Sequence, residues 1–90
     1  MGLIIVRHKV SDFATFKRAF DGHRPAQTAA GLSNPRVLRS ADDPSELVII
    51  FDAQDIGKAK QFAASPDLRS AMASAGVTDK PDIYFLEAAE

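Results

Sequence analysis

The sequence has 90 residues, 46% of them hydrophobic, with 11 basic and 12 acidic side chains and a formal net charge of −1. A chain of this length forms a single domain, residues 1–90, and the lack of a basic excess argues against a nucleic-acid partner. Without cysteine the chain can form no disulfide framework and no thiolate site. Its first apolar run is short and is followed by charge, so we expect no membrane span and a cytoplasmic protein.

The first strand and the first helix are predicted from hydrophobic patterning. Residues 3–10 are rich in Ile and Val and begin with four residues that are apolar on both faces, which is typical of a strand covered on both sides. Ser11 or Asp12 then caps a helix. One face of this helix carries three aromatic residues at spacings of three and four. They are Phe13, Phe16 and Phe20.

The next segment contains several residues that interrupt regular structure. Pro25 cannot donate a backbone hydrogen bond to the preceding turn, so it kinks the helix or starts a second short one. Gly31 ends this segment as a left-handed cap. The Asn-Pro pair at residues 34–35 predicts a turn, and residues 36–39 predict a short edge strand of mixed polarity. Turn-forming residues at 40–45 predict a hairpin loop.

The second half of the chain repeats the strand–helix–strand pattern. Residues 46–53 predict a strand with a continuous apolar centre, which indicates a central position in the sheet. Asp55 caps the next helix, residues 65–67 restart it after a break, and Gly76 ends it. A turn, a fourth strand and a frayed tail complete the chain at residues 80–82, 83–86 and 87–90.

Two such halves are the signature of an α+β, ferredoxin-like fold with the order β-α-β-β-α-β. In this fold a four-stranded antiparallel sheet carries its helices on one face, and the first and third strands are central. Both central strands are apolar on both faces, and each large side chain left exposed forgoes about 1.5–3 kcal/mol of burial. We therefore expect a homodimer formed through the sheet face. The alternative is a monomer with an exposed apolar face.

Several stretches of the sequence resemble the dimeric α/β-barrel superfamily. They are residues 6–13 (VRHKVSDF), 20–25 (FDGHRP), 30–32 (AGL), 41–44 (ADDP), 64–69 (ASPDLR) and 75–77 (AGV). The resemblance covers essentially the whole chain and includes small bacterial proteins labelled as cyclases. It implies a homodimeric α/β barrel with a ligand between sheet and helices or inside the dimer. The activities it implies range from cofactor-independent monooxygenases and polyketide cyclases to stress-responsive proteins without known chemistry.

Other proteins with this topology fit the sequence poorly. Residues 47–53 lack the basic, glycine-containing aromatic motif of RNA-recognition domains, and metal-carrier domains of this fold need a pair of cysteines. Two histidines without a clear carboxylate cluster leave the ligand count of a metal site unfilled. A glycine-rich phosphate loop is also missing, so we expect neither a metal nor a nucleotide cofactor.

The two histidines are the candidate catalytic residues. His8 shares a strand face with the apolar Ile4 and Val6, and His23 lies near the end of the first helix. In this fold the end of that helix can return close to the sheet, so both imidazoles can flank one pocket and transfer protons. The alternative is that His8 is a hydrogen-bonded core residue and that His23 is favoured by the helix dipole.

Two further residues are candidate ligand-binding groups. Tyr84, the only tyrosine, lies in the last strand, where its hydroxyl can reach a ligand carbonyl or remain in water at a sheet edge. Asp52 ends the third strand, where it can orient a histidine or serve as a strand-end or capping acid.

The sequence favours a small-molecule enzyme, or an enzyme-like pocket, of the cofactor-independent cyclase or monooxygenase type that acts on a largely apolar or aromatic compound. The alternatives are a non-catalytic ligand-binding or stress-responsive dimer and a purely structural interaction module. The direction of His8 distinguishes two versions of the site. If His8 faces the helices, the pocket belongs to each protomer; if it faces the partner sheet, the dimer forms the pocket.

Overall fold

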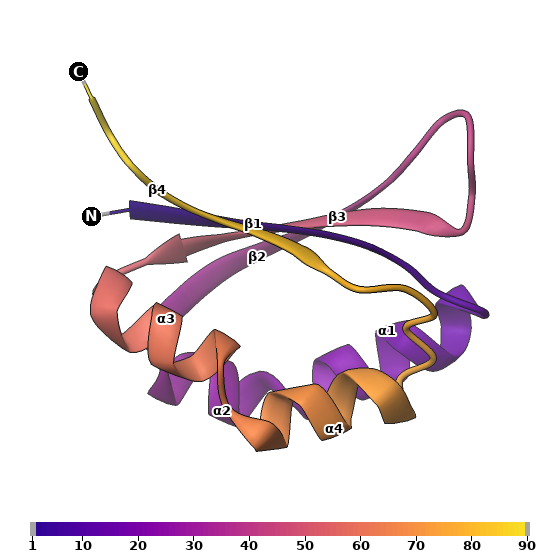
Figure 1. The fold of residues 1–90 in the computed structure, drawn as a ribbon, viewed down its shortest axis with the longest axis horizontal. Coiled ribbons are helices and arrows are strands. Elements are labelled where there is room, and N and C mark those ends of the chain that lie inside the picture. The colour runs from indigo at the N-terminus through magenta and orange to yellow at the C-terminus, as the bar shows by residue number, and fades with distance from the viewer. Residues whose placement is uncertain (1, 90) are drawn as a thin grey trace.

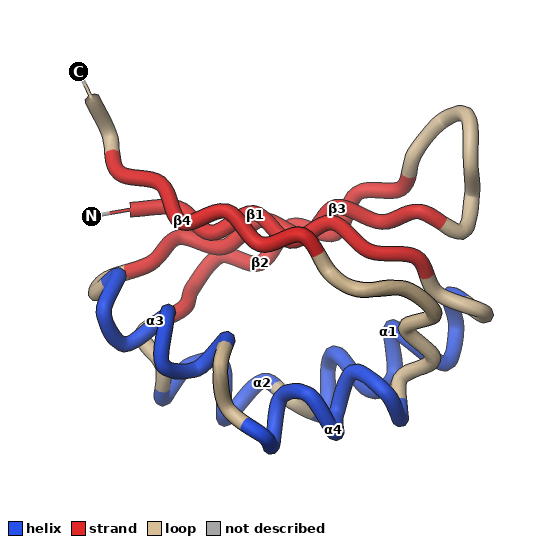
Figure 2. Tube along the Cα trace, in the orientation of Figure 1, coloured by secondary structure: helices blue, strands red, loops and turns tan. Residues whose placement is uncertain are grey.

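In the computed structural model, which describes residues 2–89, a sheet lies over a layer of helices (Figure 1). The elements are β1 (Gly2–Lys9), α1 (Phe13–Gly22), α2 (Arg24–Ala29), β2 (Leu32–Arg39), β3 (Glu46–Ala53), α3 (Ile56–Ala63), α4 (Pro66–Ser74) and β4 (Asp82–Glu87). The four strands pair antiparallel in the order β2-β3-β1-β4. Figure 2 shows all helices on one face of the sheet, so the predicted ferredoxin-like α+β class is confirmed.

The two central strands are β1 and β3, as their apolar sequences predicted. Side chains alternate along each strand, so every second residue faces the helices. Val6 lies opposite Ile49 in the register, and both are buried beneath the sheet. Ile5 lies opposite Ile50 on the other face, where no helix of the described residues covers them (Figure 2). Apolar side chains therefore occupy the middle of both faces of these two strands.

Short polar residues set the ends of the helices. Asp12 caps α1 by accepting a hydrogen bond from the Thr15 backbone amide at 3.1 Å. Asp55 caps α3 and Ser65 caps α4, as the sequence predicted. After α4, the chain turns at Gly76 with φ of 85°. A Cβ at this position would lie 2.7 Å from the Ser11 hydroxyl, so both the backbone angle and the space require glycine.

Pro25 starts a second short helix rather than kinking the first. α1 ends at Gly22, and α2 carries Pro25 in its first turn, where its missing N–H costs nothing. The residue between the two helices is His23, and the chain leaves α2 through Gly31 with φ of 80°. The break therefore turns the chain at the position of one of the candidate catalytic residues.

The turn predicted at residues 34–35 is wrong, because β2 continues through it. Asn34 has φ of 52°, and the pairing of β2 with β3 shifts register between Ser33 and Arg36. Asparagine tolerates the left-handed conformation, and proline lacks the N–H that a regular ladder needs. The pair therefore makes a bulge in an edge strand instead of ending it.

Two predicted boundaries also move. β1 ends at Lys9 rather than at residue 10, and Val10 forms only an isolated bridge with Val77. β4 is longer than the predicted residues 83–86, because Glu87 pairs with Gly2. The predicted tail accordingly begins one residue later, and Glu90 lies outside the described residues.

Candidate functional site

A cavity of about 80 Å³ lies between the helices and the inner face of the sheet. Every strand and every helix of the described residues contributes to its wall. The lining is apolar except for three side chains. These are His8, His23 and Gln27. Apolar pockets with a few polar groups are the usual sites of small-molecule binding, so this cavity is the candidate site.

His8 projects from β1 toward the helices and is only 1% exposed. Its Nδ1 has no hydrogen-bond partner among residues 2–89. Burial lowers the pKa of the imidazole below 6.5, because the cavity disfavours the charged form; the Asp79 carboxylate partly offsets this lowering. His8 is therefore neutral near pH 7 and can accept a proton. The pocket that it lines lies within a single copy of the chain, on the helical side of the sheet.

His23 reaches the same cavity from the helical layer. It caps α2 at the break after α1, and its ring packs against Phe62 with centroids 5.8 Å apart. Its Nε2 is buried and finds no partner within the described part of the chain. The structure thus places the two candidate catalytic histidines on opposite walls of one cavity, His8 on the sheet and His23 on the helical layer.

Gln27 is a third polar group in the cavity, which the sequence interpretation missed. Its backbone N–H donates to the His23 carbonyl at 3.1 Å, so the two residues lie one helical turn apart on the same side of α2. The surrounding segment, residues 26–30, reads as apolar. The four-residue spacing from His23 is the signal that could have identified Gln27 as a neighbour in the site.

A row of aromatic rings forms one wall of the cavity. The rings of His8 and Phe16 lie 5.2 Å apart, those of Phe16 and Phe20 5.6 Å, and those of Phe20 and Phe51 5.8 Å, each measured between centroids. The last two pairs are stacked, with interplanar angles of 30° and 29°. Flat aromatic molecules pack well against such rings.

The structure places Tyr84 and Asp52 away from this cavity. Tyr84 lies opposite Ile5 on the outer face of the sheet and is 53% exposed. Asp52 is on the same outer face, where it accepts hydrogen bonds from Arg36 at 2.8 Å and Asn34 at 3.3 Å. Within the described residues, Asp52 therefore pairs with an arginine of the edge strand and not with a histidine.

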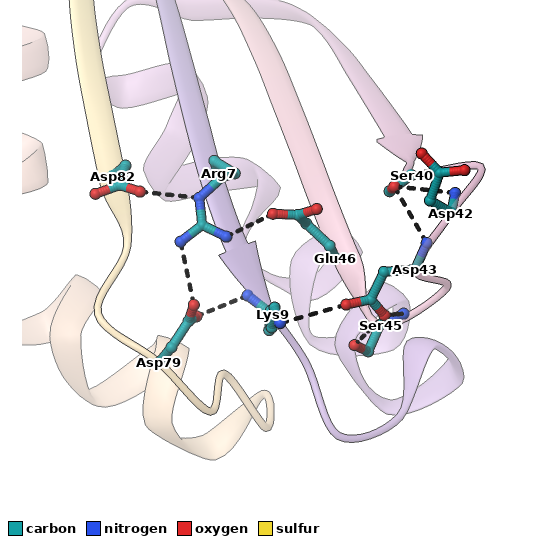
Figure 3. Close-up of polar contacts among 9 residues, drawn as sticks. All are labelled: Arg7, Lys9, Ser40, Asp42, Asp43, Ser45, Glu46, Asp79 and Asp82. Atoms are coloured by element: carbon teal, nitrogen blue, oxygen red, sulfur yellow. Dashed lines mark hydrogen bonds and ion pairs between the residues drawn. The ribbon is translucent and has the colours of Figure 1, made fainter.

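The outer face also carries a polar cluster centred on Arg7 (Figure 3). Its guanidinium donates to Glu46 at 2.7 Å, to Asp82 at 2.8 Å and to Asp79 at 3.1 Å. These carboxylates, Glu46 first, raise the pKa of Arg7 above its ordinary value. The Lys9 backbone N–H, at 2.7 Å, is the main cause that lowers the pKa of Asp79. The cluster ties β1, β3 and the segment around the start of β4 together.

Other kinds of site find little support in residues 2–89. No group of three or more His, Asp or Glu side chains in this range is arranged to hold a metal ion. The longest helix has 10 residues, well below the roughly 20 needed to span a bilayer.

No family model matches the chain, and no curated protein matches it. Solved structures do match over its whole length. A candidate antibiotic biosynthesis monooxygenase from Bordetella bronchiseptica has a TM-score of 0.78 at 18% identity, with 100% of both chains covered. The chain therefore has the same fold as this candidate monooxygenase. The resemblance found in the sequence is thus confirmed at the level of the fold.

Two further structures agree with this comparison. A second candidate antibiotic biosynthesis monooxygenase, from Caulobacter crescentus, has a TM-score of 0.74 at 18% identity over 99% of this chain and 90% of that one. A mutant of SnoaB, a cofactor-independent oxygenase from Streptomyces nogalater, has a TM-score of 0.73 at 18% identity over 99% and 93%. Identities this low establish a shared fold and leave the chemistry to the site itself.

Proposed function

We propose that the protein is a small-molecule enzyme of the cofactor-independent cyclase or monooxygenase type, acting on a largely apolar or aromatic compound in the cavity beneath the sheet. The observation that carries the proposal is His8, a buried imidazole with an unpaired nitrogen in the wall of an apolar cavity. Leaving a buried polar atom unpaired costs about 1–3 kcal/mol of stability, so its place there calls for a ligand. The name of SnoaB, an oxygenase without a cofactor, supports the same class.

The shared first step of both reaction types is removal of a proton. An acidic O–H or C–H bond of the substrate breaks, its electron pair stays on the substrate as a phenolate or enolate, and the proton binds His8. In cyclisation the carbanion attacks a carbonyl carbon of the same molecule, and the resulting alkoxide takes the proton back. In oxygenation, dioxygen is the second substrate: it adds to the carbanion carbon, and the peroxide takes the proton back from His8. The hydroperoxide then loses the remaining hydrogen of that carbon as its O–O bond breaks, so one oxygen atom becomes a ring carbonyl and the other leaves as water. His23, across the cavity, assists the return of the proton.

The proposed partner of the outer sheet face is a second copy of the chain. The large apolar side chains that residues 2–89 leave exposed all lie on this face. They are Leu3, Leu38, Tyr84 and Leu86. Two such faces stacked together would bury these groups, as in a homodimeric α/β barrel. The cavity and its histidines lie beneath the opposite face, so each protomer would keep its own site.

Turnover can be tested with one-ring phenols, namely phenol, p-cresol and 4-ethylphenol, in air-saturated buffer. Oxygen uptake and chromatography of the products measure oxygenation, and the unfolding temperature measures binding. The matched variant is His8→Phe, which keeps an aromatic ring against Phe16 and removes the proton acceptor. We expect turnover of at least one phenol by the wild type and a loss of at least 100-fold in the variant.

The competing function is ligand binding without chemistry. The observation that favours it is the small catalytic inventory of the chain, which has two histidines and no cysteine. Phenols that raise the unfolding temperature of the wild type without any product would support this alternative. Equal turnover by wild type and His8→Phe would reject His8 as the acid–base residue.

A further inference from the structure

We infer that Gln27 selects the substrate of this site, and that the substrate carries a hydroxyl group on a flat ring, whose O–H donates a hydrogen bond to the Gln27 side-chain carbonyl. This inference rests on the proposed function, because it concerns the same cavity. It adds a residue and a substrate class to that proposal.

The two ends of the Gln27 amide are in different surroundings. Nε2 faces the backbone carbonyl of Phe20 at 3.4 Å, and a carbonyl can only accept a hydrogen bond. The amide nitrogen must therefore be the atom on that side. Oε1 is left on the other side, buried and without a donor among residues 2–89. Gln27 is only 4% exposed and forms part of the cavity wall, so the cavity is the side from which a ligand would reach this buried acceptor.

The free acceptor at Gln27 has a defined requirement for its ligand. An amide oxygen cannot donate, so only a ligand with an O–H or N–H group can satisfy it. A ligand ether, ketone or hydrocarbon leaves it unpaired. A site built to bind a hydroxyl discriminates strongly against analogues that lack it, because its own polar group then stays buried without a partner.

The neighbours of Gln27 point to a ring hydroxyl. The buried Nε2 of His23 lies one helical turn away, so two unpaired polar atoms approach the cavity from α2 and its cap. Apart from His8, the rest of the wall is apolar and includes the stacked rings of Phe20 and Phe51. A phenol meets both conditions, because its ring packs against the aromatic wall and its O–H pairs with the polar end.

The test uses three probes of nearly equal shape. p-Cresol carries a hydroxyl, 4-methylanisole keeps the oxygen but cannot donate, and p-xylene has a methyl group in its place. Dissociation constants are measured by NMR titration for the wild type, for Gln27→Met and for Thr28→Met. Methionine retains the length of glutamine without its amide. Thr28 is exposed on the same helix, so its variant controls for a general effect on α2.

We expect the wild type and Thr28→Met to bind p-cresol at least tenfold more tightly than either analogue. In Gln27→Met this preference should fall to about twofold or less, while the affinity for p-xylene is kept or improved. A preference that survives in Gln27→Met would overturn the inference, because the hydroxyl would then be bound by a histidine alone. Equal binding of all three probes by the wild type would overturn the inference as well, because it would mean that water and not the ligand donates to Gln27.

These outcomes differ from a failure of the proposed function. If p-xylene and p-cresol bind equally, the apolar cavity still takes aromatic molecules and His8 can still act on them. If none of the three probes binds or raises the unfolding temperature, both the selection by Gln27 and the proposed small-molecule site are rejected. Circular dichroism spectra of the variants establish that each of them is folded.

Discussion

The imidazole of His8 on β1 and the phenyl ring of Phe16 on α1 pack edge to face, with centroids 5.2 Å apart and an interplanar angle of 65°. This contact joins the sheet to the helical layer at the candidate site. The imidazole is only 1% exposed here, and this burial favours its neutral form. The same burial that prepares His8 for proton transfer should therefore appear in the stability of the protein.

The unfolding free energy is expected to fall as the pH is lowered from 7.5 to 5. The folded state holds His8 neutral, because its pKa is lowered, whereas the unfolded chain titrates near pH 6.5. Below this pH the unfolded chain binds a proton that the folded chain does not, so acid favours unfolding. The contribution of one such group is at most about 1.4 kcal/mol per pH unit. Urea denaturation at several pH values measures it.

The variant His8→Phe should remove this part of the pH dependence. At pH 7.5 its unfolding free energy should equal or exceed that of the wild type, because the unpaired Nδ1 is gone. His23→Gln is the control, and it should keep the slope that His8 causes. A slope that persists unchanged in His8→Phe would show that another group is responsible. Aspartates with lowered pKa, such as Asp79, contribute only at more acidic pH.

Arg7 is expected to be a main determinant of stability on the outer face. It binds three carboxylates from three parts of the chain, so Arg7→Leu leaves Glu46, Asp79 and Asp82 close together without a cation. The urea midpoint should fall, and 0.5 M NaCl should recover part of the loss by screening the repulsion among the carboxylates.

The control for Arg7 is Lys17→Leu, which breaks a single exposed pair with Asp21. Pairs of this kind contribute about 0.5 kcal/mol or less, so its effect should be several times smaller than that of Arg7→Leu. Equal effects of the two variants would mean that the cluster adds nothing beyond an ordinary surface ion pair.

Much of the fold was predictable because local and long-range preferences agree. The strand predicted at residues 46–53 matches β3 residue for residue, since a continuous run of β-forming residues is bounded by turn formers and by the Asp55 cap. At residues 34–35 the local and long-range preferences disagree. Asn and Pro favour a turn locally, and only pairing with β3 decides that they form a bulge in β2.

The site was less predictable for a related reason. Alternation placed His8 on the face of Ile4 and Val6, but Leu3 and Ile5 make part of the opposite face of β1 apolar too, so the residues alone did not decide which face packs against the helices. For Tyr84 and Asp52, too, the sequence did not decide which face of the sheet their side chains lie on. Both lie on the outer face. Gln27 was hidden in a segment that reads as apolar, and its meaning depends on a cavity formed by the whole fold.

The proposed dimer predicts that a charge at the centre of the outer face prevents association. Ile5 lies between Ile50 and Tyr84 in the register, so Ile5→Lys would place an ammonium group among apolar side chains of both copies. Light scattering after size exclusion should give a dimer for the wild type and a monomer for the variant at micromolar concentration. Ser70→Lys, on the exposed side of α4, should remain dimeric. A monomeric wild type would reject the dimer.

Filling the cavity should abolish binding without unfolding the protein. Ala71 lines the cavity from α4, and Ala71→Leu adds three carbon atoms to a space of about 80 Å³. The affinity for p-cresol, measured by NMR titration, should fall at least tenfold, while the unfolding free energy changes by about 1 kcal/mol or less, because added contacts offset strain. Ala73→Leu places the same side chain on the exposed side of α4 and should bind as the wild type does. Undiminished binding by Ala71→Leu would mean that the ligand binds outside this cavity. The role proposed for His8 would then be rejected as well.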